Sequence, residues 1–323
     1  MKPFPGSVSR LKGQHILVTG GAGFIGSNLV EALLKIGARV TVLDDLSTGF
    51  EKNIKRFASA ADFSFIQGDI RDAAACRKAL EGTDAVSHQA ALGSVPRSIE
   101  FPLTTHAVNA TGFLTMLDAA KEAGVRRFVF ASSSSVYGDS LSSPKKEGCE
   151  GNALSPYAVS KQLNEQYAGV YQRLHGMETI GLRYFNVFGP YQNPNGVYAA
   201  AIPKFLDKMR LGGEIVVNGD GNQTRDFTFV QNAVLANLLS LSGTNTAAFG
   251  NVFNVACGRS LTLNNVLASL ENGLIEQGTV PAHTVVYGLK RVGDVQDSLA
   301  DISAIREQLG YEPAYSFEEG IAM

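Results

Sequence analysis

The sequence Gly20-Gly21-Ala22-Gly23-Phe24-Ile25-Gly26 follows a short apolar run, residues 15–19, and opens a segment whose apolar residues recur at helical spacing. Its glycines allow a tight turn and a close approach of the backbone to a bound group. The first turn of the following helix offers free N–H groups and a partial positive charge, which suit phosphate oxygens. The stretch therefore predicts a strand, a phosphate-binding turn and a helix.

An acidic residue, Asp44, ends the second apolar run, residues 39–44, and lies 18 residues past Gly26. An acid at this place accepts hydrogen bonds from the adenosine ribose of a dinucleotide. The neighbours at 45–47 include no arginine for a 2′-phosphate, which favours NAD over NADP. A glycine trio alone is also compatible with an ordinary tight turn. The strand, helix and acid in register favour dinucleotide binding.

Further apolar runs at residues 63–67, 85–88 and 127–131 alternate with helical patterns through the first half of the chain. This alternation predicts an α/β fold with a doubly wound parallel sheet. After about residue 186 the regularity loosens, which indicates a smaller mixed α/β domain over the carboxyl edge of the sheet. We expect a cofactor-binding domain at 1–186 and a mainly substrate-binding domain at 187–323, between which the chain can cross.

Composition excludes several classes of function. The net charge of −2 leaves no broad basic surface for nucleic acid. The three cysteines, Cys76, Cys149 and Cys257, lie far apart, which argues against a disulfide framework and a clustered metal site. His88 ends a predicted strand, and a hydrogen-bonded structural histidine is the favoured interpretation. No segment approaches the ~18 apolar residues of a membrane span. We expect a soluble cytoplasmic protein without metal or membrane partner.

A phenol and an ammonium stand four residues apart in Tyr157-Ala158-Val159-Ser160-Lys161. Pro156 suits the first position of a helix and Ser155 the cap before it, so both side chains should lie on one helix face. A free tyrosine ionises near ~10, and a nearby cation lowers this pKa, which would make Tyr157 an acid–base catalyst. The spacing alone more often reflects a packed tyrosine and a solvated lysine. The glycine turn favours the catalytic interpretation.

Together with the serines at 132–135, these motifs resemble the extended short-chain dehydrogenase/reductase family, in which a Rossmann sheet binds NAD. Within it the chain is similar to nucleotide-sugar 4-epimerases, with further motifs in family order at residues 68–72, 88–91, 183–186 and 291–294. The segments at 93–98 and 194–198 resemble those of bacterial UDP-N-acetylglucosamine 4-epimerases.

The resemblance implies a catalytic trio of Ser133, Tyr157 and Lys161. Tyr157 would take the proton of the sugar C4 hydroxyl while the C4 hydride passes to NAD, leaving a 4-keto sugar. After the sugar turns over, hydride and proton would return to the opposite face. Lys161 would bind the nicotinamide ribose and lower the pKa of Tyr157, and the Ser133 hydroxyl would bridge the sugar oxygen and Tyr157.

The resemblance also implies the binding residues. Those assigned to the cofactor, besides Tyr157 and Lys161, are Gly20, Gly23, Phe24, Ile25, Gly26, Asp44, Asp45, Ser47, Asp69, Ile70, Gln89, Ala90 and Ala91. Those assigned to the UDP-sugar are Ser94, Ser133, Ser134, Ser135, Asn186, Arg225, Arg291, Asp294 and Ser298. A surface or interdomain salt bridge is an equally common role for a lone arginine such as Arg225 or Arg291.

Ser298 carries the expectation about specificity. Plain-hexose epimerases of the family hold a tyrosine at the matching position, whose ring fills space near the sugar C2 substituent. A serine leaves room for an N-acetyl group, so we expect interconversion of UDP-GlcNAc and UDP-GalNAc. The corresponding uronic acids, UDP-GlcNAcA and UDP-GalNAcA, and the UDP-glucose/UDP-galactose pair are the alternative substrates.

Two further alternatives stay open. A dehydratase or reductase on the same scaffold would release an oxidised or reduced product, but the related 4,6-dehydratases carry Asp-Glu where Ser134 and Ser135 stand. A non-catalytic dinucleotide-binding scaffold would have no need for the catalytic trio.

The resemblance also implies a homodimer, built from the amphipathic stretches at 104–123 and 156–175. Leu103, Val108, Phe113 and Met116 would supply apolar contact. Covering their own sheet is an equal alternative from the pattern.

Overall fold

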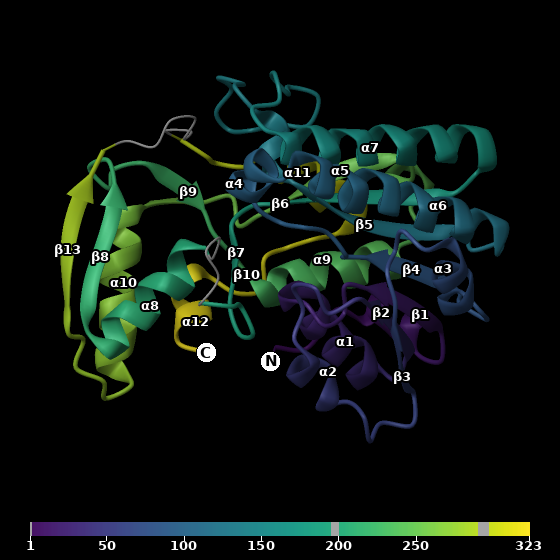
Figure 1. The fold of residues 1–323 in the computed structure, drawn as a ribbon, viewed down its shortest axis with the longest axis horizontal. Helices are drawn as coiled ribbons and strands as arrows, with labels where there is room; N and C mark the ends of the chain where they lie inside the picture. The colour runs from purple at the N-terminus through teal and green to yellow at the C-terminus, as the bar shows by residue number, and fades with distance from the viewer. Residues whose placement is uncertain (1, 195–199, 290–296) are drawn as a thin grey trace.

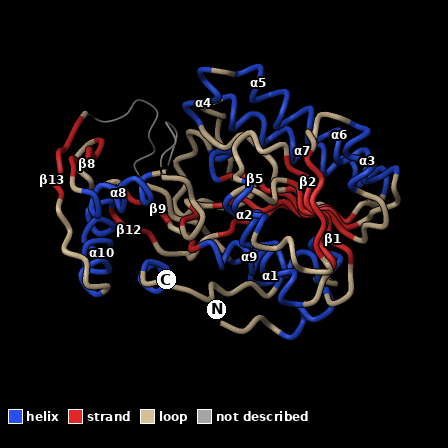
Figure 2. Tube along the Cα trace, turned by 60° about the horizontal axis from the view of Figure 1, so that its bottom comes forward, coloured by secondary structure: helices blue, strands red, loops and turns tan. Residues whose placement is uncertain are grey.

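The computed structural model describes residues 2–194, 200–289 and 297–323. A parallel sheet lies between two layers of helices, and a smaller region stands beside it (Figures 1 and 2). Parallel strands need covering on both faces, because their crossover helices pack there. The predicted doubly wound α/β architecture is confirmed.

In this described part of the chain, seven parallel strands form the sheet, in the spatial order β11-β6-β5-β4-β1-β2-β3. The bounds are β1 (His15–Thr19), β2 (Arg39–Asp44), β3 (Phe63–Gln67), β4 (Ala85–His88), β5 (Arg127–Ser133), β6 (Glu178–Tyr184) and β11 (Asn251–Val255). The first four match the predicted apolar runs, and β5 continues past its predicted end to Ser133. This extension brings the predicted catalytic serine to the carboxyl end of a strand.

Each face of the sheet has its own apolar core. One face is covered by α1 (Phe24–Ile36), α9 (Val230–Ser242) and α11 (Ser303–Leu309). The other is covered by α3 (Ala73–Ala79), α6 (Phe113–Glu122) and α7 (Pro156–His175). Shorter helices are α2 (Glu51–Lys55), α4 (Val95–Glu100), α5 (Pro102–His106), a π-helical turn (Ala107–Gly112) and 3-10 helices at Gly6–Leu11, Ser134–Tyr137 and Thr246–Ala248.

Close backbone contacts explain the glycine turn. Gly20 adopts a left-handed φ of 69°, and a Cβ there would lie 2.6 Å from the backbone nitrogen of Ala90. A Cβ on Gly26 would overlap the carbonyl oxygen of Gly20. Helix α1 can therefore begin directly against the end of β1 only because these positions lack side chains.

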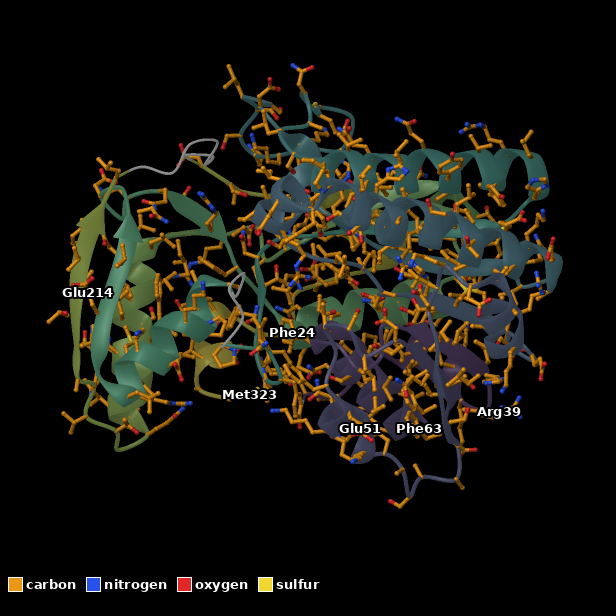
Figure 3. All side chains as sticks on the ribbon, in the orientation of Figure 1. Phe24, Arg39, Glu51, Phe63, Glu214 and Met323 are labelled. Atoms are coloured by element: carbon orange, nitrogen blue, oxygen red, sulfur yellow. The ribbon has the colours of Figure 1, made fainter. Side chains whose placement is uncertain are left out.

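The smaller region has a separate apolar core. Its elements are α8 (Ala201–Leu211), β8 (Gly213–Asn218), α10 (Leu263–Glu276), β13 (His283–Gly288) and α12 (Phe317–Ile321), with short strands β7 (Val187–Phe188), β9 (Thr224–Asp226), β10 (Thr228–Phe229) and β12 (Ser260–Thr262). Figure 3 shows Glu214 at the far edge of this region and Phe24 where it meets the sheet domain. Phe24 packs against its core, which joins the start of α1 to the smaller region.

The chain returns to the large sheet after leaving it. Helix α9 is buried along its whole length, and β11 pairs with β6 at the sheet edge. The chain after residue 187 therefore contributes to both regions: it builds the smaller region, and it adds α9 and β11 to the sheet domain. The division into a cofactor domain and a substrate domain stays a prediction.

Two residues expected at a dimer contact are packed inside the subunit. Phe113 and Met116 of α6 have no exposed surface and belong to the core shared with α3 and α7. Their apolar spacing reflects the covering of their own sheet, so their assignment to an intersubunit contact is wrong. Leu103 of α5 is 85% exposed, and Val108 is partly buried.

Among the residues with described coordinates, no helix combines the length and the apolar character needed to cross a lipid bilayer.

We predict that Gly26→Ala lowers the stability of the cofactor-free protein by about 1–3 kcal/mol, because the new methyl group would overlap the Gly20 carbonyl. Thermal unfolding measures this effect. Gly6→Ala is the control, since a Cβ there meets nothing within 4 Å. Equal unfolding temperatures for the two variants would contradict the packing argument.

Candidate active site

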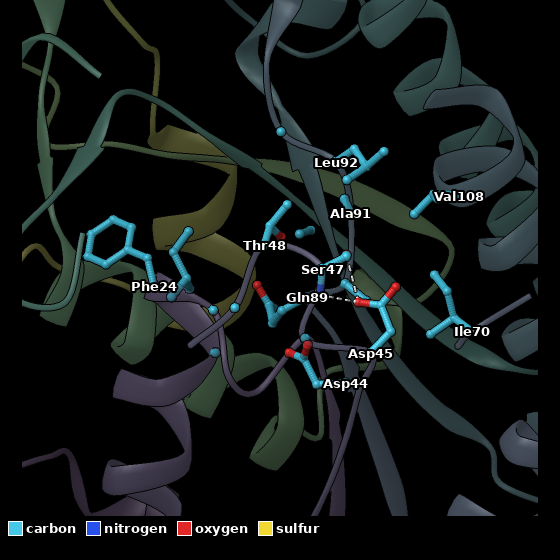
Figure 4. A pocket seen from close by; sticks show the side chains of 18 of the residues that line it. Phe24, Asp44, Asp45, Ser47, Thr48, Ile70, Gln89, Ala91, Leu92 and Val108 are labelled. Atoms are coloured by element: carbon cyan, nitrogen blue, oxygen red, sulfur yellow. Dashed lines mark hydrogen bonds between the residues drawn. The ribbon is translucent and has the colours of Figure 1, made fainter. Parts of the chain in front are cut away.

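A cavity of about 800 Å³ opens at the carboxyl ends of strands β1 to β5. Figure 4 shows part of its lining, where Asp44, Ile70 and Gln89 come from segments at the ends of three different strands. Every residue predicted to bind the cofactor lines this one cavity, Tyr157 and Lys161 included. The sequence motifs therefore converge in space, and their roles toward a cofactor remain predictions.

The start of α1 is suited to an anion. The helix begins at Phe24 after the N-cap residue Gly23, and no side chain caps its first turn. Phe24, Ile25 and Gly26 line the cavity at this point. Unsatisfied N–H groups and the helix dipole favour phosphate here.

Asp44 is almost fully buried at the end of β2. Its carboxylate accepts hydrogen bonds from the backbone N–H of Ala22 (2.9 Å) and of Leu46 (2.8 Å), which ties the glycine turn to this strand. Burial raises the pKa of Asp44, and the two backbone hydrogen bonds oppose this shift. A carboxylate held at the cavity wall suits a ribose diol and repels a 2′-phosphate.

Arg71 lies near the same end of the cavity, where the lining residue Asp69 engages it. Arg71 Nε donates to Oδ2 of Asp69 at 2.9 Å, and this contact lowers the pKa of Asp69. The donor set therefore fits NAD, with backbone N–H groups for the pyrophosphate and a carboxylate for the adenosine ribose.

Helix α7 carries the predicted acid–base pair. The Ser155 hydroxyl accepts a hydrogen bond from Ala158 N–H as the N-cap, and proline occupies the start of the helix, as predicted. Lys161 is buried, and its Nζ donates to the carbonyl oxygen of Ala131 at 2.8 Å. The same Nζ lies 5.9 Å from the centre of the Tyr157 ring.

Burial opposes the expected lowering of the Tyr157 pKa by Lys161, which stays a prediction for the enzyme with NAD bound. Burial raises the pKa of Tyr157, which a hydrogen bond with the Ser133 side chain partly offsets. Burial also lowers the pKa of Lys161 to about 8, against the attraction of Glu165. Desolvation is thus the largest influence on the pKa of both groups.

The serines at 133–135 form the turn after β5. Ser133 ends the strand, contacts Tyr157, and accepts a hydrogen bond at Oγ from the N–H of Ser135 at 3.2 Å. Ser134 begins the short 3-10 helix that follows. The Oγ of Ser135 is buried and lacks a hydrogen-bond partner among the described residues, so it has capacity to bind a ligand.

Three predicted substrate residues meet around β9, outside the lining of the large cavity. The side chain of Asn186 donates to the carbonyl oxygen of Asp226 at 2.9 Å. The N–H of Asp226 donates to the carbonyl oxygen of Ser298 at 2.8 Å, and the N–H of Ser298 donates to the carbonyl oxygen of Thr224 at 3.2 Å. Arg225 stands between these two β9 residues. The structure therefore groups Asn186, Arg225 and Ser298.

The remaining predicted substrate residues are not part of this group. Ser94 caps α4, because its hydroxyl accepts a hydrogen bond from Arg97 N–H at 3.2 Å. Arg291 and Asp294 lie outside the described residues.

His88 is the structural histidine expected from the sequence. It is buried against the rings of Phe113 and Phe128, and its Nδ1 lies 3.0 Å from the Thr19 hydroxyl. Burial lowers its pKa to about 3, so the ring is neutral. Within the described residues no group of histidine, cysteine or acidic side chains could hold a metal ion.

Sequence reasoning missed a polar network beside the cavity. Tyr184 and Gln89 line the cavity and hydrogen-bond each other at 2.9 Å, and Asn237 of α9 donates to the Tyr184 hydroxyl at 2.7 Å. Nothing in the local sequence marks Asn237, because α9 reaches this site only through the tertiary fold.

Sequence reasoning also missed Glu165, which forms an ion pair with Arg183 at 2.8 Å and lies on the helix that carries the predicted catalytic residues. The sequence did contain a signal for Glu165. It stands four residues after Lys161 and therefore on the same helix face.

Comparison with known proteins supports one family. Residues 16–256 match the model of the NAD dependent epimerase/dehydratase family. A putative UDP-glucose 4-epimerase of Methanocaldococcus jannaschii is 36% identical over 308 residues, covering 95% of each chain.

Solved structures of similar sequence have the same fold. A UDP-N-acetylglucosamine 4-epimerase from Methanobrevibacter ruminantium, in complex with UDP-N-acetylmuramic acid, superposes with a TM-score of 0.89 at 37% identity, over 96% of both chains. The UDP-glucose 4-epimerase of Thermotoga maritima with UDP-glucose gives a TM-score of 0.87 at 35% identity, again over 96% of both chains. The chain therefore belongs to the NAD-dependent epimerase/dehydratase family, as an NAD-dependent UDP-sugar 4-epimerase.

Proposed function

We propose that the protein interconverts UDP-N-acetylglucosamine and UDP-N-acetylgalactosamine by epimerisation at C4. The observation that carries this choice of sugar is the serine at 298. Its side chain is small, and its backbone is hydrogen-bonded to Thr224 and to Asp226, the residue that also binds Asn186. A serine there leaves volume for a C2 N-acetyl group, which a tyrosine would occupy.

A similar structure supports the same substrate class. The Methanobrevibacter ruminantium enzyme, named a UDP-N-acetylglucosamine 4-epimerase, holds UDP-N-acetylmuramic acid, which also carries an N-acetyl group. Other relatives carry the name UDP-glucose 4-epimerase, so UDP-glucose is the main competing substrate. The acetylated uronic acids are the second alternative.

The residues at the end of β5 and on α7 carry out the proton chemistry. When bound, NAD supplies the acceptor for the C4 hydride, its donor on return, and a positively charged ring that favours the phenolate. Tyr157 takes the C4 hydroxyl proton and gives it back, in contact with the Ser133 hydroxyl. Lys161, held by the Ala131 carbonyl, keeps a positive charge beside the phenol as the proton moves.

The nucleotide and sugar extend toward the group around β9 in this proposal. Asn186 supplies amide contacts to the diphosphate-sugar, and Arg225 supplies positive charge to the phosphates. Ser134 and the unpartnered hydroxyl of Ser135 contact the sugar. Neither serine can act as the carboxylate acid–base of a dehydratase, which disfavours elimination of water.

The test of substrate choice is a panel of UDP-sugars with the purified protein. We expect turnover of the UDP-GlcNAc/UDP-GalNAc pair to exceed that of UDP-glucose/UDP-galactose by about 10-fold or more. Chromatography of the separated epimers measures both pairs and the acetylated uronic acids. Faster turnover of UDP-glucose than of every acetylated sugar would refute the proposal.

In the same panel, Ser298→Tyr should reduce turnover of the acetylated sugars by about 10- to 100-fold and affect plain hexoses less, because the ring would occupy the C2 pocket. Ser298→Ala is the matched control and should retain the acetylated preference, since it keeps the space open. An equal loss with all substrates in Ser298→Tyr would show that the residue does not face the C2 group.

Tyr157→Phe should lower kcat by about 100- to 10,000-fold, because it removes the group that carries the proton. Tyr287→Phe, which removes the hydroxyl of a half-exposed tyrosine on β13, is the control. The absorbance of NADH should show no net change during turnover by the parent enzyme, which separates epimerisation from reduction or dehydration. Unchanged activity of Tyr157→Phe would overturn the mechanism, and an inactive parent would favour the non-catalytic scaffold.

We also propose a homodimer, formed through α4, α5 and α7, which contact one another on one side of the sheet domain (Figure 1). These helices expose apolar side chains: Ile99 is 62% exposed, Leu103 85%, Val159 45% and Tyr167 38%. Exposed apolar residues grouped on neighbouring helices are typical of a protein interface.

Leu103→Glu should convert the dimer to a monomer at micromolar concentration, because a charge would be buried at the contact. Light scattering after gel filtration measures the mass. Leu141→Glu, at a side chain that is 98% exposed on a loop, should leave the mass unchanged. A monomeric parent protein would exclude this contact.

A further inference from the structure

Glu165 completes a row of three side chains on α7. Tyr157, Lys161 and Glu165 follow one another at intervals of four residues, so they share one helix face. The Glu165 side chain is only 12% exposed, which leaves its charge largely shielded from water. The helix thus presents a phenol, an ammonium and a carboxylate in order.

Three consecutive residues at the end of β5 hold this row. The Ala131 carbonyl accepts the hydrogen bond of Lys161 at 2.8 Å, and the Ser133 side chain contacts Tyr157. Between these two residues, the Ser132 hydroxyl donates to Oε1 of Glu165 at 2.5 Å. The end of the strand and the catalytic helix are therefore joined residue by residue.

An arginine fixes the orientation of the Glu165 carboxylate. Arg183 of β6 donates through Nε to Oε1 at 2.9 Å and through Nη2 to Oε2 at 2.8 Å, a two-pronged contact that sets the plane of the carboxylate. The other side of the guanidinium contacts the Tyr137 hydroxyl at 3.0 Å and forms an ion pair with Glu150. Arg183 thus has two acidic partners, and Glu165 is the one that also acts on a second cation.

That second cation is Lys161. Burial disfavours its charged form, and Glu165 is the acidic group that opposes this effect. The other titratable groups that face the ammonium are His88, which is neutral, and Tyr157, whose pKa burial raises. Loss of the carboxylate would therefore favour the uncharged amine at the catalytic site.

We propose that Glu165 is a positioning residue for the epimerisation. Its carboxylate provides the counter-charge that keeps Lys161 an ammonium, and its contact with Ser132 holds the strand end that carries Ser133 against the helix that carries Tyr157. The role rests on the proposed proton transfer and applies to whichever UDP-sugar is the substrate.

The charge is tested by Glu165→Gln, which keeps the shape of the side chain and an oxygen for Ser132. The pH dependence of kcat is measured with UDP-GlcNAc and with UDP-glucose, for the parent and the variant. The parent should lose activity as Lys161 deprotonates, and the variant should lose it at a pH lower by about one unit. At about pH 6, where Lys161 is charged in both, the two rates should differ by only a few-fold.

Glu150→Gln is the matched control, because it removes the same charge from the opposite side of Arg183 without touching Ser132 or Lys161. The alkaline limb of the pH profile is the range in which kcat falls as Lys161 deprotonates. Glu150→Gln should shift this limb by much less than Glu165→Gln does. Ser132→Ala tests the joint separately and covers the case in which Glu165→Gln fails to fold. It should lower kcat several-fold at every pH and leave the alkaline limb in place, because the carboxylate remains.

The proposal fails if Glu165→Gln has the alkaline limb of the parent, or if Glu150→Gln shifts that limb equally, since the effect would then belong to the net charge of the region. It also fails if Ser132→Ala keeps the full kcat. These outcomes do not depend on which sugar is preferred, so they are distinct from a failure of the proposed substrate.

Discussion

The contact between the Lys161 ammonium and the Ala131 carbonyl determines how the rest of the site is arranged. It is a hydrogen bond of 2.8 Å from a buried lysine, and it joins the first turns of α7 to the end of β5. The ammonium must keep this acceptor, because a buried ammonium without a hydrogen bond is costly. The same contact brings Tyr157 to Ser133 and makes the helix one wall of the cavity that begins at the glycine turn. The residues predicted to bind the cofactor and to move the proton therefore lie at one edge of the sheet.

The parts of the fold that depend on local pattern could be predicted from the sequence. The first strands, the glycine turn and the Ser155 cap each have a signal within a few residues. Helix α9 could not be recognised, because it is buried on every side and shows no polar face to mark its period. Two pairings between distant segments could not be predicted. These are β11 with β6 at the sheet edge and Ser298 with β9, and no local sequence pattern indicates either.

The chemistry of the site shows the same division. The residue types of the catalytic trio were recognisable, but the sign of the shift in the Tyr157 pKa was not. The spacing of Tyr157 and Lys161 indicates attraction between a phenolate and an ammonium, whereas the degree of burial depends on the whole cavity. In the folded protein burial is the larger effect on both groups. A buried ammonium such as that of Lys161 therefore needs a nearby negative charge that the Tyr-Lys motif does not contain. Glu165, held by Arg183, lies where it can supply this charge.

The residues predicted to carry out the reaction and those proposed to choose the sugar lie in different parts of the molecule, and Asp226 joins two of the latter, Asn186 and Ser298. This buried carboxylate accepts hydrogen bonds from Cys257 N–H at 3.0 Å and Ala300 N–H at 3.4 Å, while its backbone binds Asn186 and Ser298. Burial raises its pKa from 3.8 to about 6, against those backbone donors. Because the native state then binds the proton more tightly than the unfolded chain, this group's contribution to stability falls as the pH rises from 3.8 to about 6. The same residue holds Asn186 and Ser298 through its backbone, so both are tied to one position of β9. In the proposed division of roles, substitutions around β9 would change the preferred sugar without changing the reaction at the sheet edge.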